Sequence, residues 1–159
     1  MRRGGAVFLA AGIAVLGAGA VLTACGSPYP GSTLGQQVRS WATSTGLAGS
    51  LATLRGDARR VLAIEARHDP AALRTDCDVL VNDALGANQN LPTPDDALSG
   101  ILTAAYGAAA AAGRDCIGAA GGDEALLART ASELTQATEG YVKAQARLDV
   151  LGATGPGRP

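Results

Sequence analysis

Few residues in this chain have the type and the spacing that acid–base, nucleophilic or metal chemistry requires. The single histidine, His68, stands at a predicted helix end, with no second histidine to complete a relay or a metal site. No serine occurs in a Gly-x-Ser-x-Gly or Ser-x-x-Lys pattern. Asp76 and Asp83 share one helix face while Asp78 points elsewhere, but acids on helices are most often solvent-exposed. We therefore expect no catalytic residues, no metal and no cofactor, and we interpret the chain as a non-enzyme.

The cysteines are more informative, beginning with Cys25 at the end of a signal-like segment. Arg2 and Arg3 precede an unbroken run of apolar and small residues from position 4 to position 24. A basic start, an apolar stretch and small residues at the cut are the order of a secretory signal. The sequence therefore predicts export.

The residues Leu22-Thr23-Ala24-Cys25 resemble the lipobox of bacterial lipoproteins, with leucine three positions before the cysteine and small residues between them. The resemblance implies that the Cys25 thiol is diacylglycerylated, that residues 1–24 are removed as a signal peptide, and that the lipid holds the new N-terminus at the membrane. Two alternatives stay open. The apolar run is long enough for an uncleaved transmembrane anchor, and ordinary signal-peptidase cleavage is the other, although it prefers a small residue where Leu22 stands. In each case the rest of the chain lies outside the cytoplasmic membrane.

With Cys25 carrying the lipid, Cys77 and Cys116 are left as an even pair in an oxidising compartment. We predict that they form a disulfide. Residues 25–32 are rich in Gly, Pro and Ser and form the predicted lipid-anchored tether, which spans at most roughly 25 Å when extended. The folded part is therefore expected close to the membrane surface.

The mature chain is mildly acidic. Loss of Arg2 and Arg3 lowers the number of basic residues from 13 to 11 against 14 acidic ones, which gives a formal charge of −3. Such a domain lacks the basic footprint of a nucleic-acid-binding protein. Its apolar residues are mainly Ala and Leu, with few aromatics, and this composition favours closely packed helices over β-sheets.

Hydrophobic periodicity predicts helices over most of residues 33–151, the predicted folded domain. The expected segments are residues 33–67 with a break or kink at Thr45-Gly46, residues 69–86 opening with an Asp-Pro cap, residues 93–118, and residues 123–151. The last segment has apolar residues at alternating steps of 3 and 4, which is typical of a bundle seam. Residues 87–94 are predicted to be a loop and residues 152–159 a disordered tail.

Four helical segments, each with one apolar stripe, predict an all-α fold, specifically an antiparallel four-helix bundle. A pair of helical hairpins that dimerises is the alternative, and an internal disulfide favours the single-chain bundle. Cys77 lies nine residues before Gly86, whereas Cys116 lies twenty-one residues after Asp95. At 1.5 Å per residue these arms differ by roughly 18 Å. A Cys77–Cys116 bond therefore requires a short second helix followed by residues 87–94 as an extended strap.

Leu34, Val38 and Trp41 are expected to cover the gap above that short helix, and the run of alanines at 108–112 is expected to make the closest helix–helix approach. A weak candidate for a binding surface lies around the strap and consists of Trp41, Asn88, Asn90 and Tyr106. Asparagine is also common in turns and at helix caps, and we prefer this structural interpretation to a binding surface.

As a whole, residues 25–151 resemble the small exported lipoproteins of actinobacteria, including mycobacteria, which have helical domains with one internal cysteine pair. The resemblance rests on the lipobox, on the composition rich in Ala, Gly and Arg, and on the two cysteines in helices, and it transfers no site residues.

We interpret the chain as a lipid-anchored cell-envelope protein that binds or scaffolds an envelope partner at the outer face of the cytoplasmic membrane. The alternative is a carrier or sensor for a small apolar ligand held in the bundle. A pocket inside the bundle would favour the carrier, and a filled core with an apolar outer patch would favour a protein partner.

Overall fold

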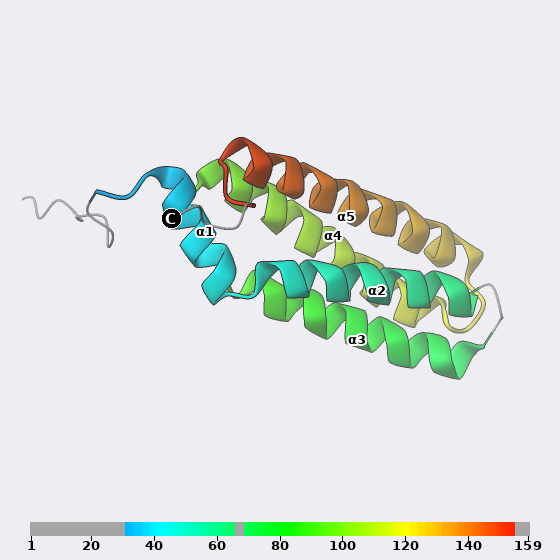
Figure 1. The fold of residues 1–159 in the computed structure, drawn as a ribbon. Coiled ribbons are helices and arrows are strands. Elements are labelled where there is room, and N and C mark those ends of the chain that lie inside the picture. The colour runs from blue at the N-terminus through cyan, green and yellow to red at the C-terminus, as the bar shows by residue number, and fades with distance from the viewer. Residues whose placement is uncertain (1–30, 66–68, 155–159) are drawn as a thin grey trace, which may run out of the picture. The chain divides into compact units, whose positions relative to one another are not determined.

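The computed structural model describes residues 31–65 and 69–154. These residues form five α-helices and contain no β-strand, which confirms the predicted all-α fold for this part of the chain. The predicted signal peptide and most of the predicted tether, Cys25 included, lie outside the described residues. The helices are α1 (Leu34–Ser44), α2 (Leu47–Glu65), α3 (Pro70–Asn88), α4 (Asp96–Ala119) and α5 (Glu124–Val150) (Figure 1).

Side-chain caps fix where the helices begin. At the start of α1, the Thr33 hydroxyl accepts a hydrogen bond from the Gln36 N–H while the Gln36 side chain accepts one from the Thr33 N–H, a reciprocal capping box. Asp69 caps α3 ahead of Pro70, as the Asp-Pro pair predicts. Asp95 caps α4 in the same way, so α4 begins just after it, slightly later than positions 93–94 where we expected it.

The predicted break at Thr45-Gly46 separates α1 from α2 and is confirmed. Gly46 has a φ of +65°, a left-handed conformation that glycine adopts without steric cost and that commonly ends a helix. The first predicted segment is therefore two helices, and α1 can leave the direction of α2.

α4 lies along both α3 and α5 and makes the closest approaches in the core (Figure 1). A Cβ placed on Gly113 would lie 2.5 Å from Val81 Cγ2 on α3, and a Cβ on Gly140 of α5 would lie 2.5 Å from the Cβ of Ala105. Three alanines of the stretch expected to be closest are buried, but the tightest approaches of α4 to its neighbours are at these two glycines. The buried alanines of that stretch are Ala109, Ala110 and Ala112.

The apolar stripe of α5 faces the core, as its 3–4 periodicity predicts. The buried residues of this helix are Thr130, Leu134, Ala137, Tyr141, Ala144 and Leu148. α2 packs on α3, whereas it barely contacts α5. The stripe of α5 is therefore covered mainly by α4.

Ion pairs fix the register of α4 against α5. Arg147 donates from Nε and from a terminal nitrogen to the two oxygens of Asp95, at 3.0 and 2.7 Å. Toward the other ends of the two helices, Arg129 Nε lies 2.9 Å from Asp115 Oδ2. The hydrogen bonds from Arg147 hold the pKa of Asp95 below its ordinary value, against the effect of burial, which raises it.

The connection from α3 to α4 is shorter than predicted. α3 continues past the expected end at Gly86 to Asn88 and has 19 residues, against 24 in α4 and 27 in α5. Residues 89–95 then lead to α4, and the side chains of Thr93 and Asp95 in this stretch are buried. The strap is thus anchored in the core near the start of α4.

α1 covers the strap as expected, but only two of the three residues predicted to do so are buried or packed against the core. Val38 is fully buried and Trp41 packs against the core, whereas Leu34 is 41% exposed. The Trp41 indole N–H donates to the carbonyl oxygen of Asn90 in the strap at 3.1 Å.

Residues 152–154, predicted to open a disordered tail, instead close α5. Gly152 has a φ of +64° and its N–H donates to the Asp149 carbonyl at 3.0 Å, while the Ala153 N–H donates to the Leu148 carbonyl at 2.9 Å. These two bonds form a Schellman motif, which satisfies the last carbonyls of a helix. The Arg39 side chain also donates to the Gly152 carbonyl. Residues 155–159, the rest of the predicted tail, lie outside the described residues.

Candidate functional site

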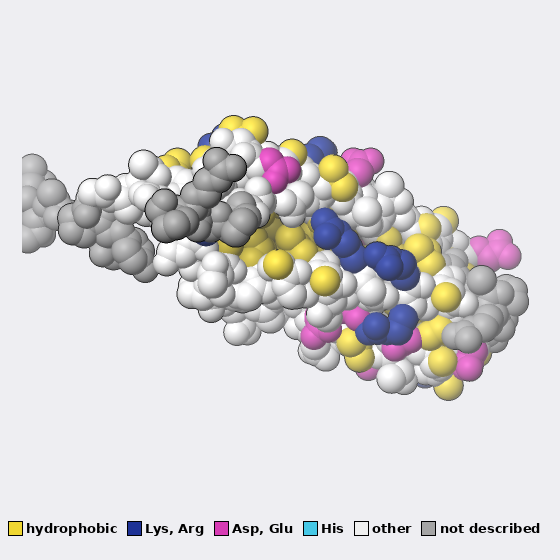
Figure 2. All heavy atoms as spheres, viewed as in Figure 1, with side chains coloured by type: hydrophobic (Ala, Val, Ile, Leu, Met, Phe, Trp, Pro, Cys, Tyr) yellow, Lys and Arg dark blue, Asp and Glu magenta, His cyan; other side chains and the backbone are white. Residues whose placement is uncertain are grey.

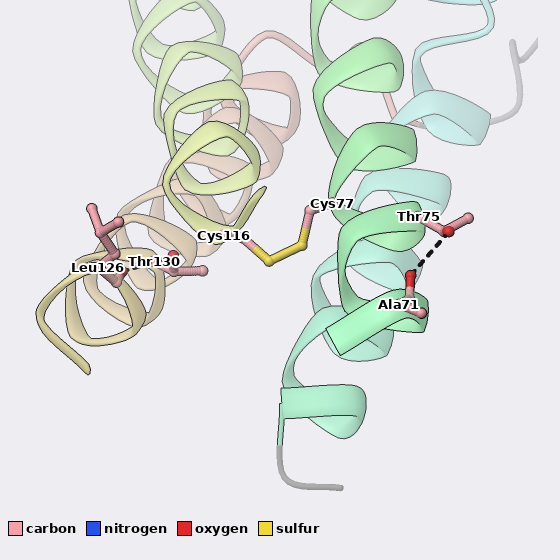
Figure 3. Close-up of a disulfide and its surroundings, with 6 residues drawn as sticks. All are labelled: Ala71, Thr75, Cys77, Cys116, Leu126 and Thr130. Atoms are coloured by element: carbon pink, nitrogen blue, oxygen red, sulfur yellow. Dashed lines mark hydrogen bonds between the residues drawn. A yellow bond between two sulfur atoms is a disulfide. The ribbon is translucent and has the colours of Figure 1, made fainter. Parts of the chain in front are cut away.

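Cys77 and Cys116 are paired as a disulfide between α3 and α4 (Figure 3). Their Cα atoms are 6.0 Å apart, within the usual range for such a bond. Both residues are fully buried on the inward faces of their helices. Because neither residue is exposed, the pair fixes two helices against each other and is out of reach of a substrate.

The weak binding surface predicted from Trp41, Asn88, Asn90 and Tyr106 does not form as a unit. Trp41 and Asn90 meet through the indole hydrogen bond, and the two asparagines are exposed at the end of α3 and in the strap. Tyr106 is only 2% exposed and its ring centroid lies 6.3 Å from that of Tyr141 in the core. Its position in α4 faces inward, so Tyr106 cannot contribute to a surface. The asparagines have the positions of cap and turn residues.

A buried carboxylate that sequence reasoning missed, Asp57, lies between α2 and α3. It is fully buried, and Arg60, one turn later, forms an ion pair with its Oδ1. Arg60 Nε also lies 3.8 Å from Asp76 Oδ1, and the carboxyl of Asp83 lies beside that of Asp57. Asp76 and Asp83 therefore share a face, as predicted, and this face is turned toward α2. Asp78 is exposed.

The surroundings of Asp57 raise its pKa to about 6. Burial is the main cause and the neighbouring Asp83 carboxyl adds to it, whereas the Arg60 guanidinium lowers the pKa. Asp57 Oδ2 and the Tyr141 hydroxyl have no hydrogen-bond partner among the described residues. Because Asp57 is sealed from solvent, its chemistry is that of an internal ion-pair network and not that of a group that meets a substrate.

Two surface hollows lie in line along the seam between α2 and α5. One of about 470 Å³ is next to α1, and one of about 430 Å³ follows it along α2. Buried leucines are at the bottom of both, and we call the two together the α2–α5 groove. The leucines are Leu47, Leu51 and Leu148 in the first hollow and Leu134 in the second. The other lining residues of the second hollow are Arg55, Ala58, Arg59, Leu62, Ala131, Thr135, Thr138 and Glu139.

Hydrophobic and basic side chains lie together on this face of the molecule (Figure 2). The guanidinium carbon of Arg55 lies 5.8 Å from the centroid of the Tyr141 ring, a cation–π contact that places Arg55 over α5. Arg55 and Arg59 form no ion pair with any residue in the described ranges. Leu62 is 44% exposed.

The sequence contained one signal of the groove, since Leu62 lies outside the inward stripe of its helix and close to two arginines. A single exposed leucine is common, however, and carries little weight by itself. What makes the groove is the loose contact of α2 with α5, which no local pattern reveals.

Other kinds of site find no support in the described ranges. No three His, Cys, Asp or Glu side chains within residues 31–65 and 69–154 are grouped so that they could hold a metal ion. None of the five helices is both long and apolar enough to cross a membrane. His68 and Cys25 lie outside the described residues. No protein-family model, curated protein or solved structure matches the chain.

Proposed function

We propose that this chain is a lipid-anchored binding protein of the cell envelope, which holds a partner at the outer face of the cytoplasmic membrane and performs no catalysis. The observation that carries the proposal is the α2–α5 groove, where buried leucines lie beside an exposed Leu62 and two arginines that form no ion pair in the described ranges. An apolar recess with a charged rim is typical of an interaction site.

The location follows from the N-terminal residues. The Leu22–Cys25 pattern supports a lipid on Cys25, and the short tether after it would keep the domain within roughly 25 Å of the membrane. A partner held by the groove would then be another component of the membrane surface.

The proposed architecture is an antiparallel four-helix bundle of α2–α5 whose α2–α5 seam is incompletely closed. The support is that each pairing joins a residue early in one helix to a residue late in its neighbour, as Cys77 with Cys116 and Asp95 with Arg147 do. In such a bundle the first and last helices are neighbours. An open seam between them is therefore a place where a further element can pack.

The carrier alternative is less well supported. A carrier of a small apolar molecule needs a site that buries most of the ligand. The hollows described above lie at a helix seam and have exposed side chains in their walls, such as Thr135 and Gln145. This arrangement favours a partner that keeps one side in water.

The anchor is tested with Cys25→Ala in the producing cell. Wild-type protein should incorporate a labelled fatty acid, fractionate with the membrane and begin at an acylated Cys25, whereas Cys25→Ala should remain an unlipidated precursor. Ser27→Ala, in the tether, serves as the control and should be lipidated normally. Cleaved but unacylated wild-type protein would contradict the anchor.

Binding through the groove is tested by placing a photoreactive amino acid at one exposed leucine at a time in intact cells. Leu62 lines the groove and Leu85 lies on α3, and they are 44% and 47% exposed. The substitution at Leu62 should give a discrete crosslinked product and that at Leu85 should not. Equal labelling from both positions, or none from Leu62, would contradict a binding role for the groove.

A further inference from the structure

The length of the α2–α5 groove matches that of a short α-helix that could lie in it. Its two hollows together extend along α2 from Leu47 to Leu62, which is roughly 22 Å at 1.5 Å per residue, and Arg55 lies over Tyr141 where one hollow gives way to the other. Most of its lining belongs to α2 and α5, so the apolar positions of these walls recur at helical spacing. An amphipathic helix laid into such a groove inserts side chains at i, i+3, i+4 and i+7.

The charges of the groove select the kind of helix. Arg55 and Arg59 are one turn apart on the α2 wall, and Arg39 lies at the α1 end. Neither Arg55 nor Arg59 has an acidic partner in the described part of the chain, although the whole chain has more acidic than basic residues. Across the groove, Glu139 has Lys143 at 3.8 Å, which offsets its charge. The unbalanced charge of the groove is positive.

The groove is also open and partly polar, which argues against an acyl chain as its occupant. Thr135, Thr138 and Gln145 are exposed on its α5 wall. A lipid tail in this position would leave much of its surface in water, whereas sites for small apolar ligands bury most of the ligand. A helix tolerates the same position because its polar face belongs in water.

We propose that the α2–α5 groove docks an amphipathic helix of a partner protein whose polar edge carries Asp or Glu residues facing Arg55 and Arg59. The proposal rests on the proposed binding function and names the chemistry of the partner. The apolar face of the partner helix packs over Leu51, Leu134 and Leu62, and its acidic edge lies along the α2 wall.

The experiment uses the full protein in nanodiscs and two synthetic 15-residue helices that share one leucine face. One helix has glutamate and the other has lysine along the same edge, and both are fluorescently labelled. Fluorescence anisotropy should show saturable binding of the glutamate helix and none of the lysine helix, with empty nanodiscs as the blank.

Charge reversal identifies the binding wall. Arg55→Glu/Arg59→Glu should weaken the glutamate helix about tenfold, because two partly exposed charge contacts are lost and reversed. Arg59→Glu alone, at an exposed residue with no ion pair in the described ranges, should give a smaller loss with an unchanged melting temperature. The matched control is Arg74→Glu/Arg114→Glu, two exposed arginines away from the groove, which should bind like wild type.

Several outcomes would overturn the proposal. Two concern the peptides: binding of neither helix, and binding of the glutamate helix by Arg55→Glu/Arg59→Glu as tightly as by wild type. The other two are saturable binding of oleate that depends on Arg55 and Arg59, and self-association that the same charge reversal abolishes. If any of these occurs while crosslinking from position 62 still gives a discrete product in cells, the binding function stands and only the acidic helix is wrong.

Discussion

Asp57 and Asp95 are both nearly or fully buried, yet their surroundings shift their pKa values in opposite directions. Asp95 accepts two hydrogen bonds from Arg147 and one from the α4 backbone, so its charged form is favoured. Asp57 has the contact with Arg60 on one oxygen, and the Asp83 carboxyl lies beside it, close enough to share a hydrogen bond when Asp57 is protonated. Its protonated form is favoured.

We predict from Asp57 that stability falls as the pH rises from about 4 to about 6.5. The pKa of this carboxyl is about 6 in the folded protein and 3.8 ordinarily, so the folded state binds more protons in this range. Its contribution is fully present below pH 3.8 and is lost as the pH passes about 6, a loss of at most about 3 kcal/mol. Urea unfolding at a series of pH values measures it.

Two variants separate this effect from those of other carboxyls. Asp57→Asn should remove the pH dependence in this range, whereas Asp78→Asn, at an exposed position, should keep it. Asp95 acts in the opposite sense and only at more acidic pH, because its pKa lies below the ordinary 3.8. An Asp57→Asn protein with the wild-type slope between pH 4 and 6.5 would show that Asp57 is not the titrating group.

Part of this cluster could be predicted from the sequence. Periodicity correctly put Asp76 and Asp83 on one face of α3, because two residues seven apart must lie on the same side of a helix. Asp57 was missed although it stands three residues after Leu54 and four before Val61, on the inward rhythm of α2. An acidic residue at an inward position breaks the apolar pattern of its helix, and the sequence alone does not show that a residue on another helix, here Asp83, lies beside it.

At the scale of elements, two of the glycines of α4, Gly107 and Gly113, have opposite surroundings. A Cβ on Gly113 would lie 2.9 Å from the Cys77 carbonyl and closer still to Val81, whereas a Cβ on Gly107 would meet nothing within 4 Å. Gly113 is buried and Gly107 is exposed. The first glycine allows α3 to pack closely, and the second only weakens the helix.

The same substitution should therefore have opposite signs at these two positions. Gly113→Ala should destabilise the protein by about 1–3 kcal/mol, because the new methyl group forces α3 away near the disulfide. Gly107→Ala should stabilise it by up to about 1 kcal/mol through helix propensity. Chemical unfolding of the two variants measures both, and a neutral or stabilising Gly113→Ala would mean that α3 and α4 are farther apart than the structure has them.

Helix faces were predictable and helix neighbours were not. The 3–4 spacing in the last segment predicted an inward stripe, and Leu134 and Tyr141 of that stripe are buried, since the face of a residue depends on local spacing alone. Which helix covers that face depends on contacts distant in sequence. The seam that α2 leaves open beside α5, where the candidate site lies, is of this second kind, and only Leu62 hinted at it.

At the scale of the whole domain, α4 is held to its two neighbours near its opposite ends. The disulfide at Cys116 ties its late part to α3, and the Asp95–Arg147 pair ties its start to α5. In the described residues α2 has no disulfide or ion pair with α5; it packs mainly on α3 and meets α5 through the Arg55–Tyr141 cation–π contact. The α2–α5 seam is therefore the least tightly held side of the domain, which is why the proposed partner is placed there.

This arrangement makes the Cys77–Cys116 bond a test of the domain as a whole. The two residues are 39 apart in sequence, and closing a loop of that size restricts the unfolded chain by about 4 kcal/mol. A typical domain has a net stability of only ~5–15 kcal/mol. The bond also has weight here because a core rich in alanine buries less apolar area per residue than one rich in leucine or phenylalanine.

We predict that the purified mature protein has no titratable thiol at positions 77 and 116, and that reduction lowers its melting temperature by more than about 10 °C. Thiol titration under denaturing conditions and calorimetry with and without reductant measure the two quantities. Cys25→Ser serves as the background, so that an unlipidated thiol at that position cannot be counted. Two free thiols and an unchanged melting temperature would contradict the bond. The register of α3 against α4 would then rest on side-chain packing and on the close approach at Gly113, and Gly113→Ala should cost more stability in that protein than in one with the disulfide.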